Sequence, residues 1–113
     1  MMHGSCHCGQ VTVAMDHTPE TVTSCNCSMC RKLGAIWTYT TRDKVQVEGS
    51  TDTYGHGDHT LDTHRCRNCG CVVVWIATDP AYERMGINIR LFEGFEQFRV
   101  RHLDGADTWE FLD

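Results

Sequence analysis

Hydrophobic and polar residues alternate along much of the chain, and this pattern predicts β-strands. The clearest alternation places Val11, Val13 and Met15 on one side of an extended segment. A run rich in β-branched and aromatic residues covers positions 35–40, and a shorter alternating segment at 45–47 leads into Glu-Gly-Ser. A repeat of two residues is typical of a strand with one buried face. The first half of the chain is therefore predicted to be mainly β.

The second half continues the strand pattern. Positions 72–76 read VVVWI, apolar at every residue, which predicts a central strand covered on both faces. Asp79-Pro80 interrupts the pattern, and two further strands are predicted at 87–92 and 97–103, separated by Glu93-Gly94.

Helical patterns are short. No window keeps an apolar stripe through three turns, so we expect a turn or two of helix after Cys27 and another at positions 106–111. The chain has 113 residues and no evident repeat or linker. We expect residues 1–113 to form a single, mainly β domain. A domain this small buries only about two-thirds of the surface that its unfolded chain exposes, and such domains are often stabilised further by disulfides or bound metal ions.

Composition and charge narrow the functional classes. The formal net charge is -5, which opposes binding to nucleic acid or to an anionic membrane. The N-terminal residues show no secretion pattern, and no apolar run is long enough to span a bilayer. We expect a cytoplasmic, reducing compartment. The eight cysteines are then expected to bind metal or do chemistry, and four disulfides are disfavoured.

The cysteines fall into three groups. Cys66 and Cys69 form a CxxC pair followed by Gly70, a spacing that lets two thiolates converge on one tetrahedral ion. Cys6 and Cys8 are too far apart on a plain strand to share a metal, so a bend is expected at or near the glycine that follows them. Together these four cysteines predict a structural zinc site that joins the N-terminus to the middle of the chain.

The third group, CNCSMC, contains only three thiols: Cys25, Cys27 and Cys30. Either Cys71 completes a second four-thiolate site, or the fourth position stays open, as in catalytic zinc sites. Two purely structural zinc ions without any chemistry are a further interpretation. Arg31 and Lys32 follow the group directly and are either a solvated surface pair or anchors for a substrate carboxylate. The histidines are weaker candidates for ligands.

Three motifs in this order resemble the glutathione-dependent formaldehyde-activating enzyme family, which is grouped with the centromere protein V domain. They are GSCHCG at 4–9, CNCSMCRKLGA at 25–35 and HRCRNCG at 64–70, and the closing LDGADTW is also similar. The resemblance implies a β-tent fold with two zinc ions per chain. It implies a structural zinc held by Cys6, Cys8, Cys66 and Cys69, and a catalytic zinc held by Cys25, Cys27 and Cys30. Cys71 departs from the small or hydroxylic residue usual after the CxxCG motif.

The activity implied by the resemblance is a carbon-sulfur lyase reaction read in reverse, in which glutathione and formaldehyde form S-hydroxymethylglutathione. The open zinc would bind the thiol and present a thiolate to a small carbonyl carbon. His56, His59 and Tyr54 are guesses for a proton donor. The rival hypothesis is a non-catalytic zinc scaffold or thiol carrier, and a nucleic-acid zinc ribbon is disfavoured by the acidic charge.

Overall fold

The computed structural model describes residues 1–113 and contains ten strands in two sheets. The smaller sheet is antiparallel and has three strands in the order β1 (Met2–Ser5), β2 (Thr12–Met15) and β5 (Val45–Glu48). The alternation at Val13 and Met15 points both side chains into the core from β2. The predicted strands at 11–15 and 45–47 are thus present.

The larger sheet has seven strands in the order β10, β3, β4, β9, β8, β7 and β6. Their bounds are β3 (Thr21–Cys25), β4 (Trp37–Thr41), β6 (Thr51–Tyr54), β7 (Leu61–Cys66), β8 (Val72–Ala77), β9 (Arg84–Asn88) and β10 (Arg99–Leu103). Only β3 and β10 pair in parallel. The apolar strand β8 lies between β9 and β7, which confirms its predicted central position. Cys25 and Cys66 end two strands of this sheet, β3 and β7, whereas Cys6 directly follows β1 of the smaller sheet.

Helix is confined to short segments, as the weak helical periodicity predicts. The one α-helix is α1 (Ser28–Leu33), and three 3-10 turns are η1 (Arg42–Lys44), η2 (Ile89–Leu91) and η3 (Phe95–Gln97). No helix has the length and apolar character needed to cross a lipid bilayer. The mainly β fold class is confirmed.

Two predicted segments differ from the structure. The strand expected at 87–92 ends at Asn88, because the Asn88 side chain accepts a hydrogen bond from the Arg90 N–H at 3.2 Å and thereby caps η2. The amide of Asn88 also donates to the Val72 carbonyl at 2.9 Å. The helical turn expected at 106–111 is absent, and Phe111 instead forms an isolated bridge with Leu103. Local apolar spacing did not reveal these side-chain and long-range bonds.

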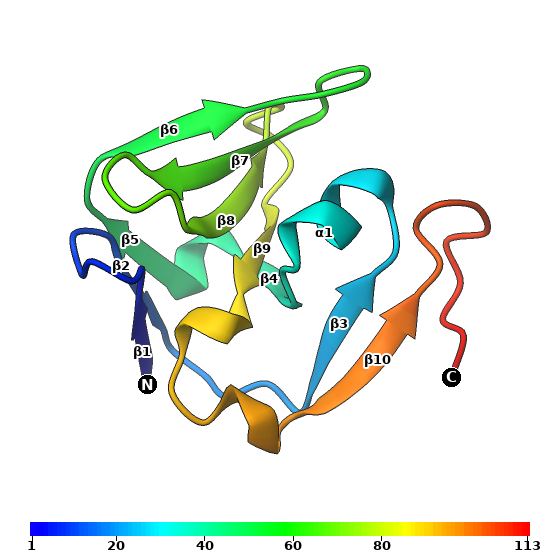
Figure 1. The fold of residues 1–113 in the computed structure, drawn as a ribbon, viewed down its shortest axis with the longest axis horizontal. Helices are drawn as coiled ribbons and strands as arrows, with labels where there is room; N and C mark the ends of the chain where they lie inside the picture. Colours follow the sequence, from blue (N-terminus) through cyan, green and yellow to red (C-terminus); the bar gives the residue numbers. More distant parts are fainter.

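The main core contains side chains from both sheets. Val13 and Met15 from β2 lie in one buried cluster with Val73, Val74 and Ile87 from β8 and β9. A second, smaller cluster holds Cys25, Cys30, Ala35 and Trp37, on the side of α1. Figure 1 shows α1 between the β6–β7–β8 part of the large sheet and its β3–β10 part. The second cluster therefore lies between the β6–β7–β8 part and the β3–β10 part of the large sheet.

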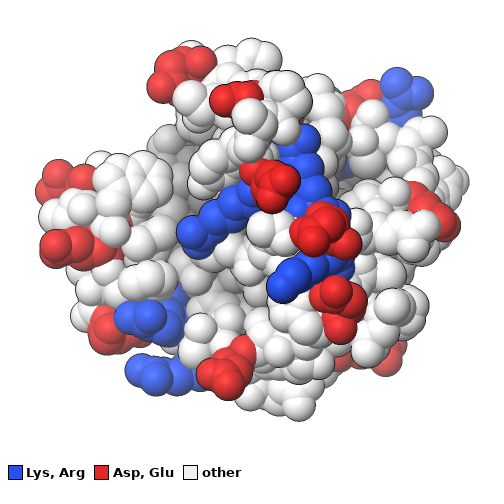
Figure 2. Space-filling view, turned by 180° about the vertical axis from the view of Figure 1, so that it is seen from behind, with Lys and Arg blue, Asp and Glu red and all other residues white.

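The charged residues are distributed over the surface with both signs. Figure 2 shows basic side chains in an oblique band across the face opposite to that of Figure 1, with acidic side chains beside and among them. Such mixing weakens any attraction to a polyanion compared with a uniformly basic face.

Candidate metal centres

Two similar turns bring the first four cysteines together. Cys6 directly follows β1 and its N–H donates to the Val11 carbonyl at 3.0 Å, whereas Cys66 ends β7 and its N–H donates to the Cys71 carbonyl at 2.9 Å. Each turn therefore closes across five residues. The chain uses one local geometry twice, at positions 60 residues apart in the sequence.

A glycine sets the direction of each turn. Gly9 and Gly70 both have a φ of 81°, a left-handed conformation that L side chains rarely adopt. The Gly9 N–H donates to the Cys6 carbonyl at 3.1 Å, and the Gly70 N–H donates to the Cys66 carbonyl at 3.0 Å. The bend predicted after the CxC pair is present. Both motifs need glycine at this position because the turn requires a positive φ there.

The sulfur positions in this four-cysteine cluster fit a tetrahedral metal ion. The Cys8 Sγ lies 3.6 Å from the Cys6 Sγ and 3.6 Å from the Cys66 Sγ, and the Cys69 thiol completes the group. A zinc ion with four sulfurs at about 2.3 Å would separate them by roughly 3.8 Å. All eight cysteines are free thiols, so none of these contacts is a disulfide. The cluster can hold one zinc-sized ion.

Backbone N–H groups point at these sulfurs. The Val11 N–H donates to the Cys6 Sγ at 3.3 Å, and the Asn68 N–H donates to the Cys66 Sγ at 3.4 Å. Hydrogen bonds from the backbone of Cys71 and of Cys8 lower the pKa of Cys69 to about 5. Donors around sulfur favour the thiolate, which is the metal-binding form.

The second cluster is built where β3 passes into α1. Cys25 is the last residue of β3, and Cys27 caps the N-terminus of α1, where its sulfur accepts the Cys30 N–H at 3.3 Å. One helical turn later, Gly34 ends the helix in the left-handed conformation. The three sulfurs lie within 4.8 Å of one another. A strand end and a single helical turn are thus sufficient to gather three thiols.

Burial and one aromatic donor shape this three-cysteine cluster. Cys25 and Cys30 are each only 8% exposed, and burial raises the pKa of both thiols. The indole N–H of Trp37 donates to the Cys30 Sγ at 3.3 Å, which favours the thiolate. Burial also disfavours the Cys27 thiolate, but hydrogen bonds from Cys30 and the backbone lower its pKa overall. A divalent cation would offset the cost of burying several thiolates together.

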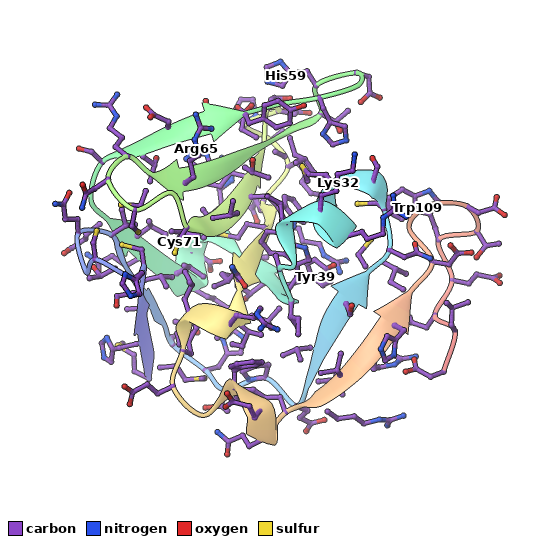
Figure 3. The ribbon with its side chains drawn as sticks, viewed as in Figure 1. Lys32, Tyr39, His59, Arg65, Cys71 and Trp109 are labelled. Carbon is purple, nitrogen blue, oxygen red and sulfur yellow. The ribbon has the colours of Figure 1, made fainter.

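No fourth cysteine, histidine or carboxylate joins the three-cysteine cluster. Cys71, the one remaining cysteine, lies away from the three-cysteine cluster and next to Cys69 of the four-cysteine cluster. A hydrogen bond from the His7 backbone lowers the pKa of Cys71, but burial and the neighbouring Cys69 sulfur raise it overall. Those contacts place Cys71 beside the four-cysteine cluster, and Figure 3 shows it well apart from α1. The three-cysteine cluster therefore offers three potential metal ligands, whereas the four-cysteine cluster offers four.

A cavity of about 580 Å³ opens against the three-cysteine cluster. Its inner wall is aromatic, formed by Trp37, Tyr39 and Trp75. Burial, followed by the nearby Cys25 sulfur, raises the pKa of Tyr39, so its hydroxyl keeps its proton at neutral pH. His56 and Asp58, from the loop between β6 and β7, add polar groups at the rim. The cavity has the size and mainly apolar lining of a small-molecule site.

The C-terminal segment forms the remaining wall. Gly105, Ala106 and Trp109 line the cavity, and a Cβ built on Gly105 would overlap the Cys25 sulfur. Trp109 has a φ of 60° and is exposed, and Figure 3 shows it in the C-terminal segment beside the loop that leads into α1. Hydrophobic patterning did not locate this wall, since its position depends on the pairing of β10 with β3; the stretch LDGADTW was noted only as part of the family resemblance.

The structure separates the other candidate residues. Lys32 lines a second hollow next to the cavity, whereas Arg31 lines a third hollow together with Arg90. Tyr54 lies in the same hollow as Lys32, with its ring stacked on His56. His59 lies outside the cavity lining and contacts Asp62, with 2.6 Å between Nε2 and Oδ1. Of the three guessed proton donors, only His56 faces the cavity.

Comparisons with known proteins agree with this architecture. A crystal structure of a protein from Rhodobacter sphaeroides superposes with a TM-score of 0.71 and 26% sequence identity, covering 88% of this chain and 99% of that one. No curated protein sequence matches the chain. Residues 1–103 match the family described as glutathione-dependent formaldehyde-activating enzyme. With nine-tenths of its length matched and seven of its eight cysteines gathered in two clusters, the chain belongs to the glutathione-dependent formaldehyde-activating enzyme family.

Proposed function

We propose that this protein joins a thiol, with glutathione as the first candidate, to formaldehyde at the three-cysteine cluster. The reaction adds the thiol sulfur to the carbonyl carbon and gives an S-hydroxymethyl adduct, a hemithioacetal. The new bond is carbon to sulfur, the carbon–oxygen π bond breaks, and the thiol proton ends on the oxygen. In the opposite direction this is the reaction of a carbon-sulfur lyase. Family membership and the cysteine geometry support the proposal.

The observation that carries the proposal is the difference between the two clusters. Four sulfurs in the first cluster fill a tetrahedral shell, which is typical of structural zinc. The second cluster has three sulfurs and adjoins the aromatic cavity, so a tetrahedral ion held there would keep one position for a ligand from outside. A zinc ion bound there would supply Lewis acidity, which lowers the pKa of a coordinated thiol. We therefore assign the four-cysteine cluster to structure and the three-cysteine cluster to catalysis.

Residues of the chain would bind and orient the reactants. The aromatic wall of Trp37, Tyr39 and Trp75 excludes water from the sulfur end of the cavity. The neutral hydroxyl of Tyr39, on the aromatic wall, and the ring of His56, at the rim of the cavity, can each donate a hydrogen bond to the oxygen of the adduct. Each can hold the oxygen without becoming covalently linked to it.

Parallel substitutions of the two clusters test the proposal. Zinc content per chain is measured first, and adduct formation is followed by exchange NMR of glutathione and formaldehyde at equilibrium, because the uncatalysed reaction is itself fast. Cys27→Ser should keep the fold, lose one zinc and lose the acceleration. Cys66→Ser should lower thermal stability strongly, since it opens the structural shell. A parent protein that never exceeds the uncatalysed rate would leave the scaffold or thiol-carrier hypothesis in its place.

A further inference from the structure

A second hollow of about 370 Å³ adjoins the cavity and contains two basic side chains. Lys32 lies in the last turn of α1, and Arg65 lies on β7, so the two come from segments on either side of the hollow. Figure 3 shows Lys32 on α1 and Arg65 on β7. Ser28, Met29 and His56 line both hollows. The two spaces therefore share a wall beside the three-cysteine cluster.

The charges in the second hollow are not balanced. No aspartate or glutamate lines it. Neither Lys32 nor Arg65 forms an ion pair or a side-chain hydrogen bond, although Arg65 is partly buried. The cross-strand neighbour of Arg65 is Asp52, but the Asp52 carboxylate accepts a hydrogen bond from Arg67 at 2.9 Å. A partly desolvated guanidinium without a counter-charge is costly and favours an anionic ligand.

We propose that Lys32 and Arg65 bind a carboxylate at the far end of the thiol substrate, whose sulfur reaches the three-cysteine cluster. The inference rests on the proposed function for the placement of the sulfur. It specifies the substrate class as a thiol that carries a carboxylate separated from its sulfur by a spacer, such as a thiol peptide. The thiol end then lies in the apolar cavity, and the anionic end lies between two cations. Arg31, which lines another hollow with Arg90, is not part of this subsite.

The test compares binding of two thiols to the zinc-loaded protein by isothermal titration calorimetry. Glutathione carries carboxylates at a distance from its sulfur, and cysteamine carries none. Arg65→Ala should weaken glutathione binding about tenfold, as expected for the loss of a charge-assisted hydrogen bond. Lys32→Ala should weaken it about two- to fivefold, because this side chain is more exposed. Cysteamine binding should be unchanged in both variants, and Arg65→Lys should recover part of the loss.

The chain offers a matched control. Arg31→Ala removes a cation from the neighbouring position of the same helix. This variant should bind glutathione as the parent does. Raising the salt concentration should weaken glutathione binding to the parent and have less effect on the Arg65→Ala variant.

The outcomes separate the subsite from the proposed reaction. If Arg65→Ala and Lys32→Ala bind glutathione like the parent, or lose cysteamine binding equally, the carboxylate subsite is wrong. A parent that binds no glutathione also overturns it. If the binding differences are found but the parent does not accelerate adduct formation, the subsite stands and the proposed reaction fails. If the parent accelerates the reaction and both variants keep its KM for glutathione, the reaction stands and the subsite fails.

Discussion

Asn26 and Asp104 are joined by a hydrogen bond of 3.0 Å across 78 residues of sequence. Asn26 lies between two cysteines of the three-cysteine cluster, and Asp104 follows the end of β10. The Asn26 amide donates to Asp104 Oδ1, while its carbonyl oxygen accepts the Ala106 N–H at 3.0 Å. One side chain thus attaches the C-terminal wall of the cavity to the loop that joins Cys25 to Cys27.

This attachment should weaken in acid. Hydrogen bonds from Asn26, and then from Thr108, lower the pKa of Asp104 below that of an ordinary aspartate. A lowered pKa in the folded state means that the stabilisation is complete above the usual pKa and is lost as the pH falls through the lower one. The carboxyl carbon shift of Asp104, followed by NMR, should titrate with a midpoint below that of an exposed aspartate without hydrogen-bond donors. Asn26→Ala should move the midpoint upward, and an unchanged midpoint would contradict this role.

The approach of Gly105 to Cys25 predicts a selective loss of metal. Gly105→Ala places a methyl group against the Cys25 sulfur and within 3.6 Å of the Cys27 Cβ. Overpacking of this kind costs about 1–3 kcal/mol. We expect the variant to retain the ion of the four-cysteine cluster and to lose the other, which elemental analysis would measure as a fall from two zinc ions per chain to one.

Gly34→Ala is the matched control for that variant. Gly34 has a φ of 71°, but a Cβ there would meet nothing within 4 Å. The control should lose stability through backbone strain and still bind both ions. Equal metal loss in the two variants would show that general destabilisation, and not contact with Cys25, displaces the ion.

The indole of Trp37 should tune the affinity of the three-cysteine cluster. Trp37→Phe keeps a buried aromatic ring but removes the N–H that donates to the Cys30 Sγ. Loss of such a partner beyond the ligands typically lowers metal affinity 10- to 100-fold. Competition with a chromophoric chelator should measure a loss in this range. Trp75→Phe is the control, because Trp75 lines the same cavity and donates no hydrogen bond to sulfur; an equal loss there would assign the effect to packing.

The sequence predicted the parts of the fold that depend on local pattern. Alternation at Val13 and Met15 located β2, and the apolar run at 72–76 located the central strand β8. The strands β1, β3, β6 and β7 were not predicted, because their polar residues hide the alternation and their partners are distant. The spacing of the cysteines also divided them into three groups along the sequence, since the cysteines of each group lie within one short segment.

The cavity could not be predicted in the same way. Its walls come from β4, from β8, from the loop after β6 and from the segment after β10, and no local motif links them. Arg31 and Lys32 illustrate the point, since adjacent residues on a helix project in different directions. Adjacency suggested one anchor made of both, whereas the fold brings Lys32 to Arg65, 33 positions further along the chain.

The last prediction concerns Cys71, which could have completed the second site. Because Cys71 lies beside the four-cysteine cluster and outside the group of Cys25, Cys27 and Cys30, Cys71→Ala should still bind two zinc ions per chain and keep the proposed activity. Its structural contact is the backbone carbonyl that accepts the Cys66 N–H, and this group is retained in the variant. Cys69→Ala, two residues away, should lose the structural ion and unfold at a lower temperature. Loss of the second ion from the Cys71 variant would make Cys71 a ligand of the proposed catalytic zinc, and the open position for a substrate thiol would no longer exist.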